Sequence, residues 1–310
     1  MKADLTVVIL TKNETIHIER CINSLINFAK RIVIVDSFST DNTLECLSQY
    51  GDTVSIYQRG WKNYSDQFQW GLDNTGIDTA WIMRMDADEY IEPDLAREIP
   101  IVLSSAKTSN ANGFYIKRKY IYKDKWIKYG GVYPLNLLRI WRNGIGRIES
   151  RWMDEHIVLS KQNTMSLKGH IVDHNLNDSI WWSQKHIGYA TREAVDLLNI
   201  KYGFFQNDDA VRSGNRDQAN LKRIIKEDIY SRIPIALRSL LYFMYRYIFR
   251  LGFLDGCIGW DFHFLQGMWY RTLVDVRYKE LEQLLKNANN NIQRVEILSR
   301  ATGFEFNNEK

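Results

Sequence analysis

The stretch Ala80-Trp81-Ile82-Met83-Arg84-Met85-Asp86-Ala87-Asp88-Glu89 indicates the fold of this chain and the edge at which it works. Five of the six residues from Ala80 to Met85 are apolar. Such a run is typical of a strand buried on both faces of a parallel sheet. Open α/β sheets bind their ligands just beyond the carboxyl ends of the strands. We therefore expect a binding site where this run stops, at Asp86.

Two carboxylates mark that strand end. Asp86 and Asp88 are two residues apart, so in extended backbone their side chains point the same way. Carboxylates this close repel one another unless a cation lies between them. Hard oxygen ligands suit Mg²⁺ or Mn²⁺, which in turn grip phosphate oxygens. The motif predicts a divalent metal and a diphosphate at the strand end, although two acids at this spacing also occur by chance in acidic loops.

Length and composition set the bounds. The chain has 310 residues, 45% hydrophobic and 25% charged, which suits one large globular domain or two ordinary ones. The net charge of +4 points to no particular partner, and we expect no nucleic acid. Three widely separated cysteines indicate a reducing compartment. With no apolar leader and no uncharged run near ~18 residues, we expect a cytoplasmic protein, soluble or surface-attached.

Strand and helix patterns alternate ahead of the acidic strand, which predicts a parallel, doubly wound sheet. Thr11 or Asn13 is expected to cap the first helix, with Glu14 placed for a capping box. No glycine-rich dinucleotide loop or phosphate-binding lysine loop follows the first strand, so dinucleotide redox chemistry and P-loop chemistry are unlikely matches. The expected strands are Thr6–Leu10, Arg31–Asp36 and Thr53–Gln58, and the expected helices run near Ile18–Ile26, Leu44–Tyr50 and Tyr64–Asn74.

Three stretches together carry a family resemblance. Val7–Glu14 (VVILTKNE), Ile34–Thr43 (IVDSFSTDNT) and Met85–Glu89 (MDADE) fall in order at three predicted strand ends. They resemble the family 2 glycosyltransferases of the GT-A fold, in particular the bacterial lipopolysaccharide-core glucosyltransferase-like branch. The resemblance implies a Rossmann-like, mostly parallel sheet with flanking helices over residues 1–176, the nucleotide-sugar-binding catalytic domain. A helical C-terminal region would follow over residues 177–310.

The resemblance also implies roles for single residues. Asp36 would bind the uracil or ribose side of a nucleotide-sugar, and Asp88 would be the firmer metal ligand of the acidic pair. Gln67 matches a family helix that commonly reads Gln-x-Asn, whereas Gln69 stands where Asn is usual, which puts its role in doubt. The implied nucleotide-sugar site consists of Thr11, Asn13, Glu14, Asp36, Gln67 and Asp86.

Arg151-Trp152-Met153-Asp154-Glu155-His156 is a second chemical cluster. Inverting sugar transfer needs one carboxylate to take a proton from the attacking hydroxyl. Adjacent side chains in extended backbone point opposite ways, so only one of Asp154 and Glu155 can face the site. We favour Glu155, which resembles the acid of the family motif, and keep Asp154 as the second candidate. The alternative is an exposed acidic turn.

A strand over Met165–Val172 leads to Asp173-His174-Asn175. Neutral imidazole is a good ligand for Mn²⁺-like metals, and enzymes with the GT-A fold often take a third metal ligand from a late histidine. We predict His174, with His170 as the alternative, beside Asp86 and Asp88. A structural role for the histidine is the competing interpretation.

The C-terminal third has a helical pattern from Ser179 onward. Pro234–Arg250 is very apolar and is punctuated by arginines. Such a helix suits the headgroup region of an anionic membrane, which would place the protein at the inner face of the cytoplasmic membrane. The alternative is a helix buried against the catalytic domain. The arginines predicted to reach lipid phosphates are Arg232, Arg238, Arg246 and Arg250.

The leading hypothesis is a metal-dependent inverting glycosyltransferase. Its donor would be a nucleotide diphosphate sugar, expected to be a UDP-hexose or UDP-N-acetylhexosamine, and its acceptor a hydroxyl of a glycan or lipid-linked glycan of the cell surface. A sugar-phosphate nucleotidyltransferase would need a glycine-rich basic loop that Thr11–Glu14 lacks. A non-catalytic membrane-surface protein on this scaffold predicts loss of the site acids, yet Asp36, Asp86, Asp88 and Glu155 are present.

Overall fold

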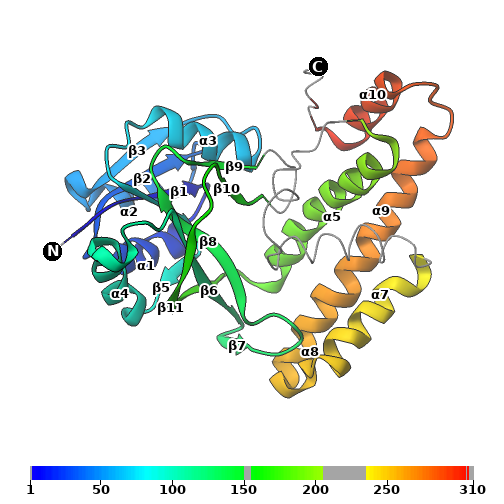
Figure 1. Cartoon of the computed structure of the whole chain (residues 1–310). Helices are drawn as coiled ribbons and strands as arrows, with labels where there is room; N and C mark the ends of the chain where they lie inside the picture. Colours follow the sequence, from blue (N-terminus) through cyan, green and yellow to red (C-terminus); the bar gives the residue numbers. More distant parts are fainter. Residues whose placement is uncertain (1, 150–154, 205–234, 305, 307–310) are drawn as a thin grey trace. The chain divides into compact units, whose positions relative to one another are not determined.

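The computed structural model describes residues 2–149, 155–204, 235–304 and 306 (Figure 1). The chain divides into two compact units. The first holds Met1–Ser150 and Glu155–Leu176, and the second holds the helices from Asn177 onward.

A nine-stranded sheet forms the first unit, in the order β3-β2-β1-β4-β8-β6-β11-β5, with β7 paired to β6. The half β3-β2-β1-β4 is entirely parallel, because each strand returns through a helix. Strand β8 then runs antiparallel to β4 and β6. The predicted α/β fold class is confirmed. The strands are β1 Ala3–Thr11, β2 Ala29–Asp36, β3 Val54–Gln58, β4 Trp81–Asp86, β5 Glu89–Ile91, β6 Gly113–Tyr122, β7 Lys125–Ile127, β8 Leu135–Arg142, β9 Gly146–Ile148, β10 Ile157–Leu159 and β11 Thr164–His174.

Helices cover both faces of the parallel half of the sheet. Alternate side chains of β1 point to opposite faces and join a separate apolar core on each. Val7 and Ile9 pack with Ile22 of α1 in one cluster, whereas Val8 packs with Phe68 of α3 in the other. All five side chains are fully buried. Burying both faces explains why the strands are continuously apolar. The helices of this unit are α1 Thr15–Leu25, α2 Thr43–Ser48, α3 Tyr64–Asn74 and α4 Pro93–Ser104, with short 3₁₀ turns at Gly51–Thr53 and Ala106–Thr108.

The expected cap of the first helix is wrong. Glu14 is the N-cap residue of α1 and makes no side-chain cap bond. The Thr11 hydroxyl donates to Asp36 and Asn13 Oδ1 accepts the Thr40 N–H, so the next strand and its loop have taken these side chains. Strand β5 and helix α4 were not anticipated either, although Pro93 directly after Glu92 is a helix-start signal.

Strand β11 passes so close to α4 at Gly169 that only glycine fits at this position. A Cβ at Gly169 would lie 2.6–2.8 Å from the Cβ, Cα and N of Leu95, and backbone cannot move aside cheaply. We expect Gly169→Ala to lower the free energy of unfolding by about 2 kcal/mol or more, measured by urea denaturation. Gly60→Ala is the matched control, since nothing lies within 4 Å of its Cβ position. Equal stability of the two variants would contradict the close approach.

The second unit is built around α5 and α9. Leu198 of α5 packs with Leu281 and Leu285 of α9 in one apolar cluster. A partly buried ion pair adds to it, since Arg271 Nη1 lies 2.5 Å from Glu193 Oε1. The described helices of this unit are α5 Ser179–Tyr202, α7 Ile235–Met244, α8 Gly256–Phe264, α9 Tyr270–Leu285 and α10 Asn291–Thr302, with π-helical turns at Tyr245–Phe249 and Leu265–Trp269 and a 3₁₀ turn at Gly252–Asp255.

The prediction that four arginines of this region reach lipid phosphates is wrong for two of them. Arg238 is only 4% exposed and pairs with Asp275 of α9. Arg246 is 8% exposed and its guanidinium lies over the rings of Tyr242 and Phe262. Arg250 is exposed, and Arg232 lies outside the described residues. The local pattern could not reveal the burial, because the partner of Arg238 lies on a helix far along the chain.

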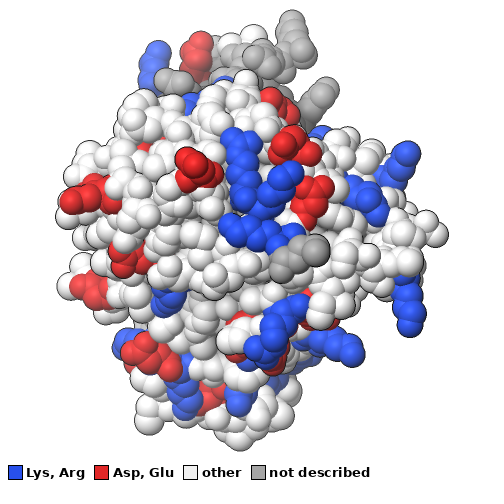
Figure 2. Space-filling view, turned by 90° about the vertical axis from the view of Figure 1, so that its left-hand side faces the viewer, with Lys and Arg blue, Asp and Glu red and all other residues white. Residues whose placement is uncertain are grey.

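Among the described helices, none combines the length and apolarity needed to cross a membrane. Figure 2 shows one face of the molecule, on which acidic and basic side chains are interspersed and neither sign covers the face. Charge therefore does not single out a partner on this face.

Candidate active site

The ends of the parallel strands bring the predicted donor residues to one edge of the sheet. In the backbone register Thr11 lies opposite Asp36, and Leu10 lies opposite Asp86. Asp36 in turn faces Gln58 of β3. Residues far apart in the sequence thus meet at the edge where α/β sheets bind ligands.

Asp36 is fully buried and organises the loop that follows it. Its Oδ1 accepts the Thr11 hydroxyl at 2.9 Å and the Ser39 hydroxyl at 2.5 Å. Its Oδ2 accepts the Ser39 N–H at 2.9 Å and the Gln58 amide at 3.3 Å. Four donors on one carboxylate fix residues 37–39 against β1. Asp36 thus holds the loop after β2, and its predicted contact with a nucleotide stays a prediction.

The loop residues after β1 are held in the same way. Asn13 has a left-handed backbone (φ 57°), its N–H donates to Ser39 Oγ, and its Oδ1 accepts the Thr40 N–H at 2.8 Å. Glu14 Oε2 lies 2.6 Å from Nδ1 of the buried His17. The two loops after β1 and β2 therefore form one hydrogen-bonded wall.

Two glutamines of α3 have different roles. Gln67 is buried, and its amide donates to Ser37 Oγ and to the Arg59 carbonyl, both at 3.1 Å. Gln69 Oε1 accepts the Ile148 N–H at 3.1 Å and so secures β9. Gln67 supports the loop after β2, whereas Gln69, where the family usually has Asn, serves the sheet.

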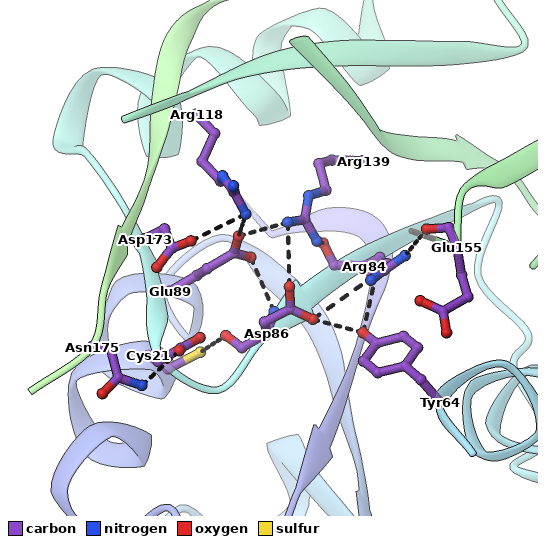
Figure 3. A network of polar contacts seen from close by, with 11 residues as sticks. Cys21, Tyr64, Arg84, Asp86, Glu89, Arg118, Arg139, Glu155, Asp173 and Asn175 are labelled. Atoms are coloured by element: carbon purple, nitrogen blue, oxygen red, sulfur yellow. Dashed lines mark hydrogen bonds and ion pairs between the residues drawn. The ribbon is translucent and has the colours of Figure 1, made fainter. Parts of the chain in front are cut away.

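Asp86 lies inside an arginine-rich network (Figure 3). The Tyr64 hydroxyl donates to Asp86 Oδ1 at 2.6 Å, and Arg139 Nη2 lies 3.4 Å from Oδ2. Arg84 stacks over the Tyr64 ring at 4.5 Å and places Nε 3.9 Å from Asp86 Oδ1. Arg139 also reaches Glu89 Oε1 at 2.5 Å. The first acid of the motif is thus already neutralised by protein cations.

The pKa values of the two acids in this network move in opposite directions. Burial opposes the charged form of Asp86, but Arg84, Arg139 and the Tyr64 hydroxyl outweigh it and hold the pKa of Asp86 well below its usual range. Burial raises the pKa of Glu89, with Arg139 opposing the shift and the Asp86 charge adding to it. The arginines therefore favour the charged form of Asp86 more strongly than burial opposes it.

Asp88 occupies the turn between β4 and β5, and β11 brings its neighbours to it. Asn175 donates its amide to Asp88 Oδ2 at 3.0 Å, and Arg20 donates to the Asp88 carbonyl at 3.1 Å. The carboxylate is half-buried and, unlike that of Asp86, no arginine is paired with it in the contacts of the described chain. The prediction that Asp88 is a metal ligand stays a prediction, and its carboxylate differs from that of Asp86 in having no arginine partner among the described contacts.

His174 lies beside Asp88 through the backbone, since its N–H donates to the Asp88 carbonyl at 3.3 Å. Its ring has other partners: Nδ1 lies 3.2 Å from Arg20 Nη1, and Nε2 lies 3.0 Å from Asp124 Oδ1. Burial and the Arg20 charge lower the pKa of His174, so the ring is neutral near pH 7. A metal could take a ring nitrogen only by displacing one of these partners.

The positions of Asp86, Asp88 and His174 can be compared with those of a divalent metal site. Within the described ranges, no group of three or more His, Cys, Asp or Glu side chains is arranged to hold a metal ion. Mg²⁺ and Mn²⁺ sites that also carry a substrate phosphate commonly use only one or two carboxylates, with phosphate oxygens and waters completing the shell. Asp88 fits such a site. The full set of Asp86, Asp88 and His174 would require rearrangement.

Glu155 is tied to the end of β4. Its carbonyl accepts a hydrogen bond from Arg84 Nη1 at 3.0 Å, and its charge favours the charged form of Arg84 (Figure 3). The side chain is half-buried. The neighbouring His156 carbonyl accepts the Glu149 N–H at 2.8 Å. Asp154, the second candidate base, lies outside the described residues.

Comparison with known proteins now gives the family. Residues 6–156 match the model of glycosyl transferase family 2, a span that contains Asp36, Asp86, Asp88 and Glu155. Over this span the chain matches glycosyl transferase family 2. The predicted recognition of the family and of its fold is confirmed.

Two bacterial proteins are similar to this chain over different lengths. A glycosyltransferase of lipopolysaccharide core biosynthesis from Rhizobium meliloti, LpsC, is 29% identical over 225 residues, 69% of this chain and 74% of the relative. An uncharacterized glycosyltransferase from Rickettsia bellii is 35% identical over 109 residues, 35% of this chain. That match spans only 36% of the Rickettsia protein. A crystal structure of S. aureus TarS 1-349 with UDP-GlcNAc aligns at 15% identity and TM-score 0.45, covering 99% of this chain and 93% of that one.

Several residues of the family 2 site escaped sequence reasoning. Arg84, Arg139 and Tyr64 form the cationic and phenolic cage of Asp86, and Glu89 completes it. Arg84 left a signal, as a single charge inside an otherwise apolar strand, and Glu89 closes the quoted acidic stretch although it was given no role. Tyr64 and Arg139 come from elements whose packing beside β4 cannot be read from local sequence.

Proposed function

We propose that the protein is an inverting glycosyltransferase that moves a sugar from a nucleotide diphosphate sugar to a hydroxyl of a cell-surface glycan precursor. The observation that carries this proposal is the link through Arg84, which joins the Asp86 strand end to the backbone of Glu155. This link supports the proposal because it holds the backbone of the candidate base Glu155 near the strand end that carries Asp86. We expect a UDP-hexose or UDP-N-acetylhexosamine as donor, following the sequence resemblance.

A divalent metal, Mg²⁺ or Mn²⁺, is part of the proposal. Asp88 would hold it, with diphosphate oxygens and water as the remaining ligands. Bound there, it would neutralise the charge that develops on the leaving diphosphate. Asp86 and His174 stay predicted ligands, and each would first have to give up the contacts described above.

The chain's own residues would perform the transfer as follows. Glu155, or Asp154 in its place, takes the proton of the acceptor hydroxyl as its oxygen attacks the anomeric carbon. A new carbon–oxygen bond forms on the face opposite the diphosphate, and the old bond breaks with its electron pair going to the nucleoside diphosphate. One displacement inverts the anomeric centre. The wall formed by Thr11, Asn13 and the loop held by Asp36 would orient the nucleotide.

The acceptor is proposed from the chemistry of relatives. The Rhizobium relative is named for lipopolysaccharide core biosynthesis, which supports a lipid-linked glycan as acceptor class here. Such an acceptor resides on a membrane, so we also propose that the protein works peripherally at the inner face of the cytoplasmic membrane.

A donor panel tests the proposal directly. The full chain is titrated by calorimetry with UDP-, GDP- and dTDP-sugars, each with Mn²⁺ and with a chelator. We expect binding of a UDP-sugar that is lost on chelation, and slow release of UDP when water replaces the acceptor. With an α-linked donor, the sugar released to water should first appear as its β anomer by NMR.

Two results would overturn parts of the proposal. If the nucleotide sugar binds equally well in the presence of a chelator, the proposed metal requirement is wrong, but the proposed glycosyltransferase activity still stands. Failure to bind any nucleotide sugar, combined with release of pyrophosphate from a nucleoside triphosphate and a sugar phosphate, would establish the nucleotidyltransferase alternative.

A further inference from the structure

The second unit carries a dense exposed apolar surface. Of the 26 large hydrophobic side chains exposed in the described chain, 12 lie within residues 237–264, here called the apolar tip. They include Leu241 (51%), Phe249 (75%), Leu254 (51%) and Trp260 (46%). Monomeric soluble proteins rarely expose so contiguous an apolar segment without a partner for it.

The tip is a built element with its own core. Phe243 of α7 is buried, stacks on Tyr247 at 5.3 Å and meets Trp260 of α8 edge-on at 5.5 Å. The exposed residues of α7 recur at helical spacing, as Leu237, Leu241 and Met244, on the side away from buried Arg238 and Ser239. The tip packs through one face around Phe243, so its apolar outer face is not a failure of the fold.

Nearly all charged side chains of the apolar tip point into the protein. Arg238, Arg246 and Asp255 are buried, and Asp261 is half-buried. Within residues 237–264, all of which are described, Arg250 is the one exposed charged side chain, and no exposed acid opposes it. A surface of aliphatic and aromatic groups with a lone exposed cation suits the boundary between lipid headgroups and acyl chains.

We propose that the apolar tip inserts into the interfacial layer of an anionic lipid bilayer, with insertion of apolar side chains as the main source of affinity. Tyr245 and Trp260 have apolar rings with polar ends, the residue types enriched at this depth. Arg250 then meets a lipid phosphate. This differs from a helix held by four arginines, because two of them are committed to the interior, and it does not depend on the proposed sugar transfer.

Vesicle sedimentation of the full chain separates these modes of binding. Vesicles of equal parts phosphatidylcholine and phosphatidylglycerol should bind the protein at low salt and retain most of it at about 1 M NaCl, where charge attraction is screened. The triple variant Leu241→Asn, Phe249→Asn, Leu254→Asn should lower the partition coefficient at least about tenfold. Arg250→Gln should lower it at most about fivefold, and only at low salt.

A matched control removes equally exposed apolar groups elsewhere: Ile101→Asn, Ile187→Asn and Ile292→Asn (69, 52 and 64% exposed) should leave partitioning unchanged. As a direct probe, Cys257 is exposed on α8, and Cys46→Ser leaves it and buried Cys21. A polarity-sensitive dye on Cys257 should shift to the blue with vesicles and be quenched by spin-labelled lipid.

Three results would overturn the proposal. The wild-type chain does not bind these vesicles at low salt. The tip variant loses thermal stability as a core variant does, which would mean that the surface is covered in solution. The tip variant turns a dimer into a monomer by sedimentation velocity without changing vesicle binding, which would make a second copy of the chain the occupant.

Discussion

Replacing Asp88 with Asn is expected to lower the affinity for Mn²⁺ and a UDP-sugar by at least about 100-fold while Tm stays within about 2 °C. The Asn side chain keeps an oxygen for the Asn175 amide but loses the charge that would face the cation. Asp88 is half-buried and its carboxylate serves no arginine in the described contacts, so the fold loses little. Calorimetry with and without metal, beside a thermal melt, makes the measurement.

Asp86→Asn is the matched control, because it removes the same charge two residues away with the opposite outcome. Arg84 and Arg139 would lose the carboxylate that neutralises them, and a broken buried pair costs about 3 kcal/mol. We expect Tm to fall by several degrees at about 2–4 °C per kcal/mol. If Asp88→Asn is the destabilised variant and Asp86→Asn the one that loses metal, the roles of the two acids are reversed.

Glu155→Gln is expected to bind donor as the wild type does and to lose transfer by about 10²-fold or more, the usual effect of removing a general base. Glutamine keeps the backbone carbonyl that accepts from Arg84, so the link to β4 should survive. Measurements of kcat and of donor affinity on the same preparation separate chemistry from binding.

Asp154→Asn completes the test of the base. It should retain most of its activity if Glu155 is the base. An inactive Asp154→Asn beside an active Glu155→Gln would show that the wrong neighbour was chosen. Loss of donor binding in Glu155→Gln would instead make Glu155 a pocket residue.

Local sequence predicted the strands and the edge at which they end. The apolar runs that end at Thr11, Asp36 and Asp86 became adjacent parallel strands, since burial on both faces leaves a strong local signature. The acids of the motif followed from the same signature. Family resemblance added names and roles that periodicity alone does not give.

The contacts that could not be predicted from the sequence join segments that lie far apart along the chain. Arg139 reaches Asp86 only because β8 lies antiparallel beside β4, and Arg238 is buried only because Asp275 lies opposite it. The same reason explains why the predicted helix cap was wrong: the Thr11 hydroxyl donates to Asp36, which lies on a different strand. Long side chains with several donors are the least predictable, because their partners are chosen by the fold.

The hydrogen bond between Asp88 and Asn175 joins residues 87 positions apart, which has a consequence for synthesis on the ribosome. At about 5–20 residues per second, Asn175 is added about 4–17 s after Asp88. Until then the nascent chain can close the parallel strands that precede Asp88, yet the turn that carries Asp88 lacks its β11 neighbours. A chain that stalls in this interval would present the joined loops after β1 and β2 beside an incomplete sheet edge, and it would be a substrate for chaperones.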